Sequence, residues 1–206
     1  MKKTILMFAA AGLMLATPSC KKGENDPALS LSSRKARLSK NWKLSSAEYT
    51  TVDVYDWGGD TYTSTTTYSY DGTNMTTVTS LAGPGGTVTN PADVRTYSEQ
   101  HTFEKDGAYS GSVTDDGDTD SFEGFWAFVG KSKVQELKKK EAVLITFTKT
   151  IYSGNTNTYD GESLFPDGYM MLDRLAGDEL VVALDYSATY SNGDTYSITG
   201  TKTYTE

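Results

Sequence analysis

Apolar and polar residues alternate with a period of two along most of the chain. Short runs rich in Thr, Tyr, Val, Ile and Phe are separated by Gly, Asn and Asp, and helical periodicity is almost absent. Such alternation is typical of β-strands. The pattern predicts ten strands: Trp42 to Val52, Thr61 to Tyr70, Thr73 to Leu81, Val94 to Glu104, Ala108 to Thr114, Phe122 to Val129, Ala142 to Tyr152, Tyr169 to Leu175, Leu180 to Tyr190 and Thr195 to Tyr204.

Three joins between the expected strands carry the sequence of tight hairpin turns. Asp71-Gly72, Asp106-Gly107 and Asn192-Gly193 supply the positive φ angles that such turns require. Sequential hairpins form an antiparallel meander, and a long meander hides its edges by closing into a barrel or by packing as two sheets. We predict an all-β, antiparallel up-and-down barrel of about 8 to 10 strands. A two-sheet β-sandwich is the alternative.

Two stretches interrupt the alternation. Residues 82 to 92 contain Gly83-Pro84-Gly85-Gly86 and Asn90-Pro91, which predict a flexible surface loop. Residues 131 to 141 contain the run Lys138-Lys139-Lys140, where we expect a solvated connection with at most one helical turn.

The first 20 residues have the pattern of a bacterial export signal. A basic head at Lys2 and Lys3 precedes an apolar run from Ile5 to Ala16, which is shorter than the roughly 20 residues that span a bilayer. Small residues before Cys20 resemble a lipoprotein signal, which implies a signal peptide over residues 1 to 19 and acylation of Cys20. The expected location is the outer membrane of a Gram-negative cell envelope, on either face. A cleaved secretory signal with a free thiol is the alternative.

Charge divides the expected mature chain into two parts. Residues 21 to 40 hold six basic and two acidic residues, whereas residues 41 to 206 hold 11 basic and 25 acidic residues. We therefore expect a basic, flexible tether over residues 20 to 40 beside an anionic membrane surface, followed by one acidic domain over residues 41 to 206. The acidic domain argues against nucleic acid as a partner, because the phosphates would be repelled.

The expected barrel lacks the outer surface of a membrane-spanning one. A transmembrane barrel needs a continuously apolar face toward lipid. One face of the second expected strand instead carries Thr61, Thr63, Thr65, Thr67 and Ser69. Hydroxyl groups suit water, so the acyl chains are the expected attachment to the membrane.

Five segments, taken in order, resemble the lipocalin-like domains of bacterial surface lipoproteins. They are Leu38 to Leu44, Phe103 to Tyr109, Gly124 to Phe128, Tyr169 to Leu175 and Asp178 to Val182, and together they span nearly the whole mature chain. The resemblance implies a lipocalin-like or calycin-like barrel with Trp42 at its closed end. Such domains also stack an Arg from the final strand on this tryptophan. Here the last expected strand offers only Lys202 for that place, with Arg174 as an earlier substitute.

The resemblance also implies a binding function. A small hydrophobic or amphipathic ligand would enter the barrel, with Phe122, Trp126, Phe128, Tyr169 and Met171 as its wall, and no cofactor or catalytic residue is expected. A barrel of this size is also close to the limit at which side chains alone fill the interior, so the same residues suit a packed core.

An interaction protein of the cell envelope is the alternative function. Tyr55, Trp57, Tyr62, Tyr68 and Tyr70 lie close together in the sequence. Aromatic side chains suit contacts with a glycan or with another protein. The same residues could also be ordinary outward-facing strand residues.

The only histidine, His101, is a weak candidate for catalysis. Alternation places it on one strand face with Tyr97, Glu99 and Phe103, and Glu99 is a possible hydrogen-bond partner. A general base also needs a nucleophile within reach, and no residue is identified as one. A structural or surface histidine is therefore expected, and the protein is expected not to be an enzyme.

The sequence offers few candidate metal ligands. Zinc normally takes His and Cys ligands, and the chain has one of each. The run from Asp115 to Glu123 gathers carboxylates that suit calcium, but Ser121 and Ala127 stand where a calcium loop needs Gly and Glu. An acidic hairpin tip is expected there, with calcium binding as an open alternative.

Overall fold

The computed structural model describes residues 32–129, 142–152, 155–163 and 169–206. Cys20, the expected signal segment and the connection at residues 131 to 141 lie outside these residues. Helix α2 (Arg34–Leu38) precedes twelve strands: β1 (Asn41–Trp57), β2 (Asp60–Tyr70), β3 (Asn74–Gly83), β4 (Gly86–Thr89), β5 (Asp93–Phe103), β6 (Ala108–Asp115), β7 (Asp118–Phe128), β8 (Ala142–Tyr152), β9 (Asn155–Ser163), β10 (Tyr169–Leu175), β11 (Glu179–Thr189) and β12 (Thr195–Thr205). No helix among the described residues is long and apolar enough to cross a membrane.

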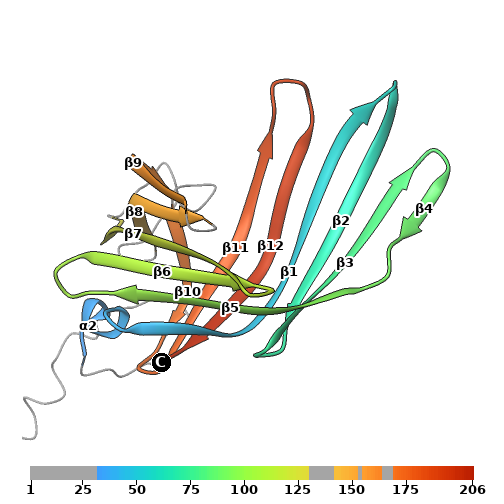
Figure 1. Ribbon diagram of the computed structural model, residues 1–206. Coiled ribbons are helices and arrows are strands. Elements are labelled where there is room, and N and C mark those ends of the chain that lie inside the picture. The colour runs from blue at the N-terminus through green and yellow to red at the C-terminus, as the bar shows by residue number, and fades with distance from the viewer. Residues whose placement is uncertain (1–31, 130–141, 153–154, 164–168) are drawn as a thin grey trace, which may run out of the picture.

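Ten strands form a closed antiparallel barrel (Figure 1). Strands β1, β2, β3, β5, β6, β7 and β8 pair in succession, β8 pairs with β10, and β10, β11 and β12 lead back to β1. The ring follows the chain order, so the predicted up-and-down barrel is confirmed. The sandwich alternative is wrong, because the pairs β8–β10 and β12–β1 close the sheet on itself.

The barrel flares at one end. β1 pairs directly with β5 at residues Asn41 to Lys43, and it pairs with β2 only from Ala47 onward. The hairpins β11–β12, β1–β2 and β3–β4 then extend side by side beyond strands β5 to β8 (Figure 1). We call residues 49 to 69, 76 to 90 and 184 to 200 of these hairpins the flared sheet.

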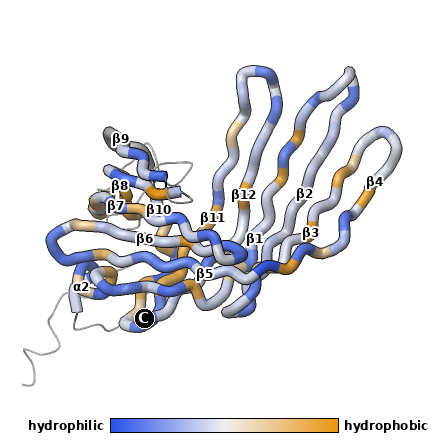
Figure 2. Tube along the Cα trace, in the orientation of Figure 1, coloured by the Kyte–Doolittle hydropathy of each residue, from blue (hydrophilic) through white to orange (hydrophobic). Residues whose placement is uncertain are grey.

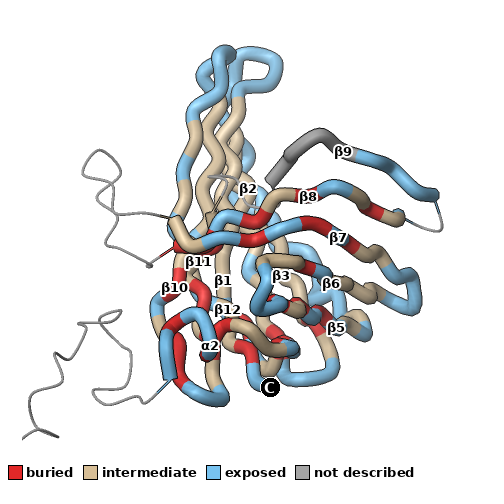
Figure 3. The backbone as a smooth tube through the Cα atoms, turned by 90° about the vertical axis from the view of Figure 1, so that its left-hand side faces the viewer, coloured by how far each residue is buried: buried red, intermediate tan, exposed pale blue. Residues whose placement is uncertain are grey.

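The hydrophobic core occupies the end of the barrel opposite the hairpin tips. Buried segments concentrate near α2 and the C-terminus, whereas the tips of the β1–β2 and β11–β12 hairpins are exposed and hydrophilic (Figures 2 and 3). The fully buried side chains include Trp42, Phe103, Ile145, Met170 and Leu180. Their burial on several different strands holds the ring closed through the hydrophobic effect.

Trp42 lies buried beside helix α2. Its indole Nε1 donates a hydrogen bond of 2.9 Å to the carbonyl of Leu38, and the Lys40 ammonium lies 5.9 Å from its ring centre. The helix begins at the N-cap Ser33 and buries Leu38. The expectation of a flexible tether up to residue 40 is therefore wrong for this helix, whose short length and few apolar residues give little helical pattern.

The two cations expected near Trp42 have other partners. Lys202 donates to Glu99 at 2.6 Å, and Arg174 pairs with Glu179 at 2.5 Å. Lys40, which immediately precedes β1, takes the position over Trp42 instead. A cation adjacent in sequence reaches the ring without crossing the barrel.

All ten predicted strands are present, but two further strands are not predicted. β4 lies in the expected loop of residues 82 to 92, and β9 follows β8. β4 is exposed along its whole length, and β9 has the polar sequence NTNTYDGES. Neither strand has the apolar alternation that comes from packing one face against a core.

An irregularity in β8 changes which residues face the core. The register with β7 shifts by one residue between Glu123 and Gly124, so Phe147 and Thr150 are both buried although they are three residues apart. Strict alternation along the predicted strand would place Ile151 on the face of Phe147, and the structure places Thr150 there instead. A bulge of this kind reverses the alternation beyond it.

Candidate functional site

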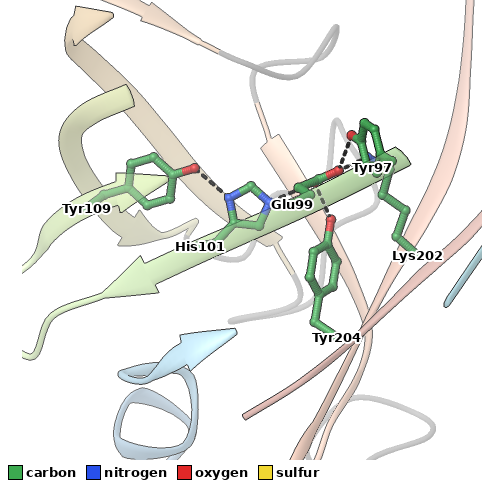
Figure 4. Close-up of polar contacts among 6 residues, drawn as sticks. All are labelled: Tyr97, Glu99, His101, Tyr109, Lys202 and Tyr204. Carbon is green, nitrogen blue, oxygen red and sulfur yellow. Dashed lines mark hydrogen bonds and ion pairs between the residues drawn. The ribbon is translucent and has the colours of Figure 1, made fainter. Parts of the chain in front are cut away.

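A polar network lies inside the barrel around Glu99 of β5 (Figure 4). The Glu99 carboxylate accepts four hydrogen bonds: Oε2 from the Tyr97 hydroxyl at 2.8 Å and Lys202 Nζ at 2.6 Å, and Oε1 from His101 Nε2 at 2.8 Å and the Tyr204 hydroxyl at 2.7 Å. Strands β5 and β12 supply these groups. A buried carboxylate with four donors is well compensated for its loss of water.

His101 extends this network to β6. Its Nδ1 lies 2.7 Å from the Tyr109 hydroxyl, and its Nε2 must carry the proton that the Glu99 carboxylate accepts. Gly111 pairs with His101 across the strands, and a Cβ there would lie 2.6 Å from the Tyr109 hydroxyl oxygen. A glycine at this position leaves room for the bond between Tyr109 and His101.

The charges inside the barrel are balanced. Burial alone would raise the pKa of Glu99, but the Lys202 ammonium and the hydrogen bond from His101 outweigh it and hold this pKa well below its usual value. Burial, followed by the negative charge of Glu99, raises the pKa values of Tyr97, Tyr109 and Tyr204. Glu99 is therefore ionised at neutral pH and the tyrosines are neutral.

The order Tyr109, His101, Glu99 matches the order of hydroxyl, base and acid in a catalytic triad, but the groups are closed to substrate. Their exposed fractions are 3%, 1% and 7%. The hydrogen bond between Glu99 and His101, which the sequence suggested as possible, is present. The burial of both side chains supports a structural role for His101.

Three of the residues predicted to line a ligand cavity lie together. Phe122 stacks on Phe147 with ring centroids 5.4 Å apart, and Trp126 meets Phe103 edge-on at 5.6 Å and Phe128 at 5.5 Å. Trp126 Nε1 also donates to the carbonyl of Glu104 at 2.9 Å. Phe122 and Trp126 are each only 6% exposed, so they pack against other aromatic side chains.

The other two predicted lining residues lie on the opposite face of their strand. In β10, Met170 and Leu172 are 0% and 3% exposed, whereas Tyr169 and Met171 are half-buried. Successive residues of a strand point to opposite faces, so the interior face belongs to Met170 and Leu172. The prediction that Tyr169 and Met171 face the interior is wrong by one residue of register.

The interior face of β1 continues into the flared sheet as a row of aromatic residues. Tyr49 and Tyr68 stack at 4.4 Å, Tyr55 and Tyr62 stack at 5.9 Å, and Trp57 lies 6.1 Å from Tyr62. β1 and β2 are paired so that these side chains share the face of the buried Ala47. Trp57, at the hairpin tip, is 72% exposed.

β11 and β12 add further tyrosines to this face. Tyr186 and Tyr196 lie 6.3 Å apart, and Tyr190 is 57% exposed at the hairpin turn. We call the complete set the tyrosine face: Tyr49, Tyr55, Trp57, Tyr62, Tyr68, Tyr186, Tyr190 and Tyr196. Of the aromatic residues singled out from the sequence, Tyr70 is the exception, because it is buried in the barrel core.

A shallow hollow lies among these rings. Its volume is about 410 Å³, and it is lined by Asp53, Val54, Tyr55, Ser64, Tyr190, Asp194 and Thr195. Burial, and then the Asp53 carboxylate, raise the pKa of the neighbouring Tyr196. The hollow therefore combines phenol rings with carboxylates.

The acidic tip considered for calcium has protein partners. Asp115 pairs with Arg95 at 2.6 Å, and Asp116 accepts hydrogen bonds from the backbone and hydroxyl of Thr96. Within the described ranges, no group of three or more His, Cys, Asp or Glu side chains is placed to hold a metal ion.

Comparison with known protein families, curated proteins and solved structures finds no match to this chain. Function is therefore inferred from the side chains themselves. The barrel interior offers a packed core and a closed polar network, whereas the tyrosine face offers accessible rings and a hollow.

Proposed function

We propose that the protein is a membrane-anchored, lipocalin-like lipoprotein of the cell envelope that binds an amphipathic small ligand without catalysing a reaction. The binding surface is the tyrosine face at the flared end of the barrel. The observation that carries this proposal is the continuity of one sheet face, which is a packed core at one end and an open row of aromatic rings at the other.

The exposure of the side chains favours the tyrosine face over the barrel interior as the ligand-binding site. Phe122 and Trp126, which would form the wall of an interior site, are 6% exposed and engaged with other rings. On the tyrosine face, Tyr55 and Tyr190 border a hollow, and Trp57 extends beyond it. Concave sites with aromatic walls and a few polar groups are the usual form of small-ligand sites.

The membrane anchor is proposed from the sequence alone. Acyl chains on Cys20 would hold the protein at the membrane, since each buried methylene contributes about 0.8 kcal/mol. The absence of catalysis is supported by the burial of His101.

Contact with a glycan or another envelope protein is the second candidate function. The exposed indole of Trp57 lies at the tip of a hairpin, where it can reach a partner larger than the hollow. Exposed aromatic rings suit contacts with a glycan and contacts with another protein.

Replacing Tyr55 and Tyr190 together by serine is expected to release the ligand while leaving the barrel intact. The full chain is extracted in mild detergent and analysed by native mass spectrometry. We expect the wild type to carry a small molecule and the double variant to lack it, because the hollow loses its two walls. The mass of the chain also tests the anchor, since a chain that starts at an acylated Cys20 has a characteristic mass.

Phe125→Ser is the matched control. Phe125 is 62% exposed on β7, outside the tyrosine face, so its removal takes away an exposed ring and leaves the hollow unchanged. We expect this variant to keep the ligand. A wild type without bound molecule, or a double variant that keeps it, would contradict the proposal.

A further inference from the structure

The flared sheet carries charge of one sign only. Residues 49 to 69, 76 to 90 and 184 to 200 contain no Lys, Arg or His. They contain five acidic residues: Asp53, Asp56, Asp60, Asp185 and Asp194. A surface with this composition repels anions and attracts cations.

Two of these carboxylates border the hollow beside the tyrosine rings. Asp53 and Asp194 line it together with Tyr55 and Tyr190. Asp194 accepts hydrogen bonds from neutral groups, the backbone N–H of Asp56 at 3.3 Å and the Asn192 amide at 2.7 Å. In the part of the chain that the structure describes, no basic side chain pairs with Asp53 or Asp194.

We propose that this hollow binds an organic cation, such as the primary or quaternary ammonium group of an amphipathic molecule. This inference rests on the proposed function and specifies the chemical class of its ligand. A cation over the face of a tyrosine ring is attracted by the ring quadrupole, and a nearby carboxylate adds a Coulomb attraction. An apolar tail would then lie along the remaining rings.

The protein's own cation occupies a similar environment on the same sheet face. Lys202 Nζ lies 5.8 Å from the centre of the Tyr49 ring and 2.6 Å from Glu99 Oε2. A phenol ring and a carboxylate thus hold an ammonium group where the tyrosine face meets the core. The hollow repeats this combination with Tyr55 and Asp53 and without a basic residue of the flared sheet itself.

Charge also distinguishes this ligand from other occupants of the face. A second copy of the chain would bring its own Asp53 and Asp194 against those of the first copy, with no base in either flared sheet to pair with them. A fatty acid or a phosphorylated molecule would place its anion against Asp53 and Asp194. An ammonium group complements the face.

A matched pair of probes tests the inference. Choline carries a quaternary ammonium group, and 3,3-dimethylbutan-1-ol has the same shape with a neutral carbon in place of the nitrogen. Ligand-observed NMR titration of the full chain is expected to show choline binding at least about fivefold tighter than the neutral analogue, as a cation–π contact and one ion pair together allow. The preference is expected to weaken as salt is added, because exposed charges are screened.

Asp53→Asn tests the position of the site, and Asp185→Asn is its control. Both variants remove one negative charge from the flared sheet. Asp185, however, lies exposed on the opposite face of the sheet, away from the hollow. We expect Asp53→Asn to weaken choline binding about threefold to fivefold, and Asp185→Asn to leave it unchanged.

The outcomes separate this inference from the proposed function. Equal binding of both probes, or no binding of choline, would overturn the cationic ligand, even where native mass spectrometry still finds a molecule on the tyrosine face. Equal effects of Asp53→Asn and Asp185→Asn would also overturn it, because they would indicate attraction to the net charge without a site.

Discussion

Replacing Glu99 with glutamine is expected to lower the free energy of unfolding by about 3 to 5 kcal/mol, the usual effect of removing one partner from a buried ion pair. The variant leaves the Lys202 ammonium, which now lies 2.6 Å from Glu99 Oε2, without its counter-charge. It also turns the carboxylate, which accepts hydrogen bonds from His101 and Tyr204 among others, into an amide. One of the two accepting oxygens becomes an NH2 group, which can only donate. Chemical denaturation monitored by circular dichroism measures the change.

Glu123→Gln is the matched control for this prediction. Glu123 pairs with Lys149 at 2.9 Å, but its side chain is 58% exposed, and exposed ion pairs contribute at most about 1 kcal/mol. We also expect the double variant Glu99→Gln, Lys202→Met to recover part of the lost stability, because it removes the unpaired ammonium. Equal small effects of Glu99→Gln and Glu123→Gln would contradict the role given to the buried network.

Stability is expected to fall at both ends of the pH scale. The pKa of Glu99 is lowered in the folded protein, so its contribution is complete above the unfolded carboxyl pKa of about 4.3 and is lost as the pH falls below that value. The pKa values of Tyr109 and Tyr204 are raised in the folded protein, so their contribution is complete below about pH 10 and is lost above it. Each of these two tyrosines then contributes a loss of about 1.4 kcal/mol per pH unit.

Denaturation at a series of pH values measures both effects. Tyr204→Phe is expected to reduce the alkaline slope by about 1.4 kcal/mol per pH unit, because one titrating group is removed. Glu99→Gln is expected to flatten the acid side and to leave the alkaline slope in place. An alkaline slope that Tyr204→Phe leaves unchanged would show that this tyrosine ionises equally in the folded and unfolded chains.

The barrel could be predicted from the sequence because its strands are encoded locally. A strand such as Ala142–Tyr152 packs one face on the core and therefore alternates in hydrophobicity. Gly72, Gly107 and Gly193 take positive φ angles at the three predicted hairpin turns. A long run of consecutive hairpins must hide its two edge strands, which favoured closure into a barrel over a two-sheet sandwich.

Errors arose where a single residue changes the register. The sequence of β10 alternates too weakly to distinguish Met170 from Met171 as the inward residue, since both are apolar. In β8, the bulge beside Gly124 moves Thr150 into the core in place of Ile151. A Cβ at Gly124 would lie 2.0 Å from the carbonyl oxygen of Thr146, so this glycine permits the close approach of β8. No local pattern indicates such a shift.

The tyrosine face was only partly predictable for a different reason. The sequence places Tyr55, Trp57 and Tyr62 close together, but Tyr186 and Tyr196 join them through the pairing of β12 with the other end of the chain. Gly200 permits the close pairing of β12 with β1. Its φ is 141°, and a Cβ at this position would lie 2.2 Å from the carbonyl oxygen of Glu48. Contacts between distant segments depend on closure of the ring, which local alternation does not specify.

A ligand bound on the tyrosine face and a ligand bound inside the barrel would lie beside different tryptophan indoles, so the three indoles report the position of the ligand directly. Trp57 belongs to the tyrosine face, Trp126 to the interior and Trp42 to the end beside helix α2. The measurement is an NMR spectrum of isotope-labelled tryptophan, recorded as the co-extracted ligand is stripped and then added back. We predict that the Trp57 indole signal shifts while those of Trp126 and Trp42 stay in place. A shift of the Trp126 signal with the Trp57 signal unmoved would place the ligand inside the barrel and contradict binding on the tyrosine face.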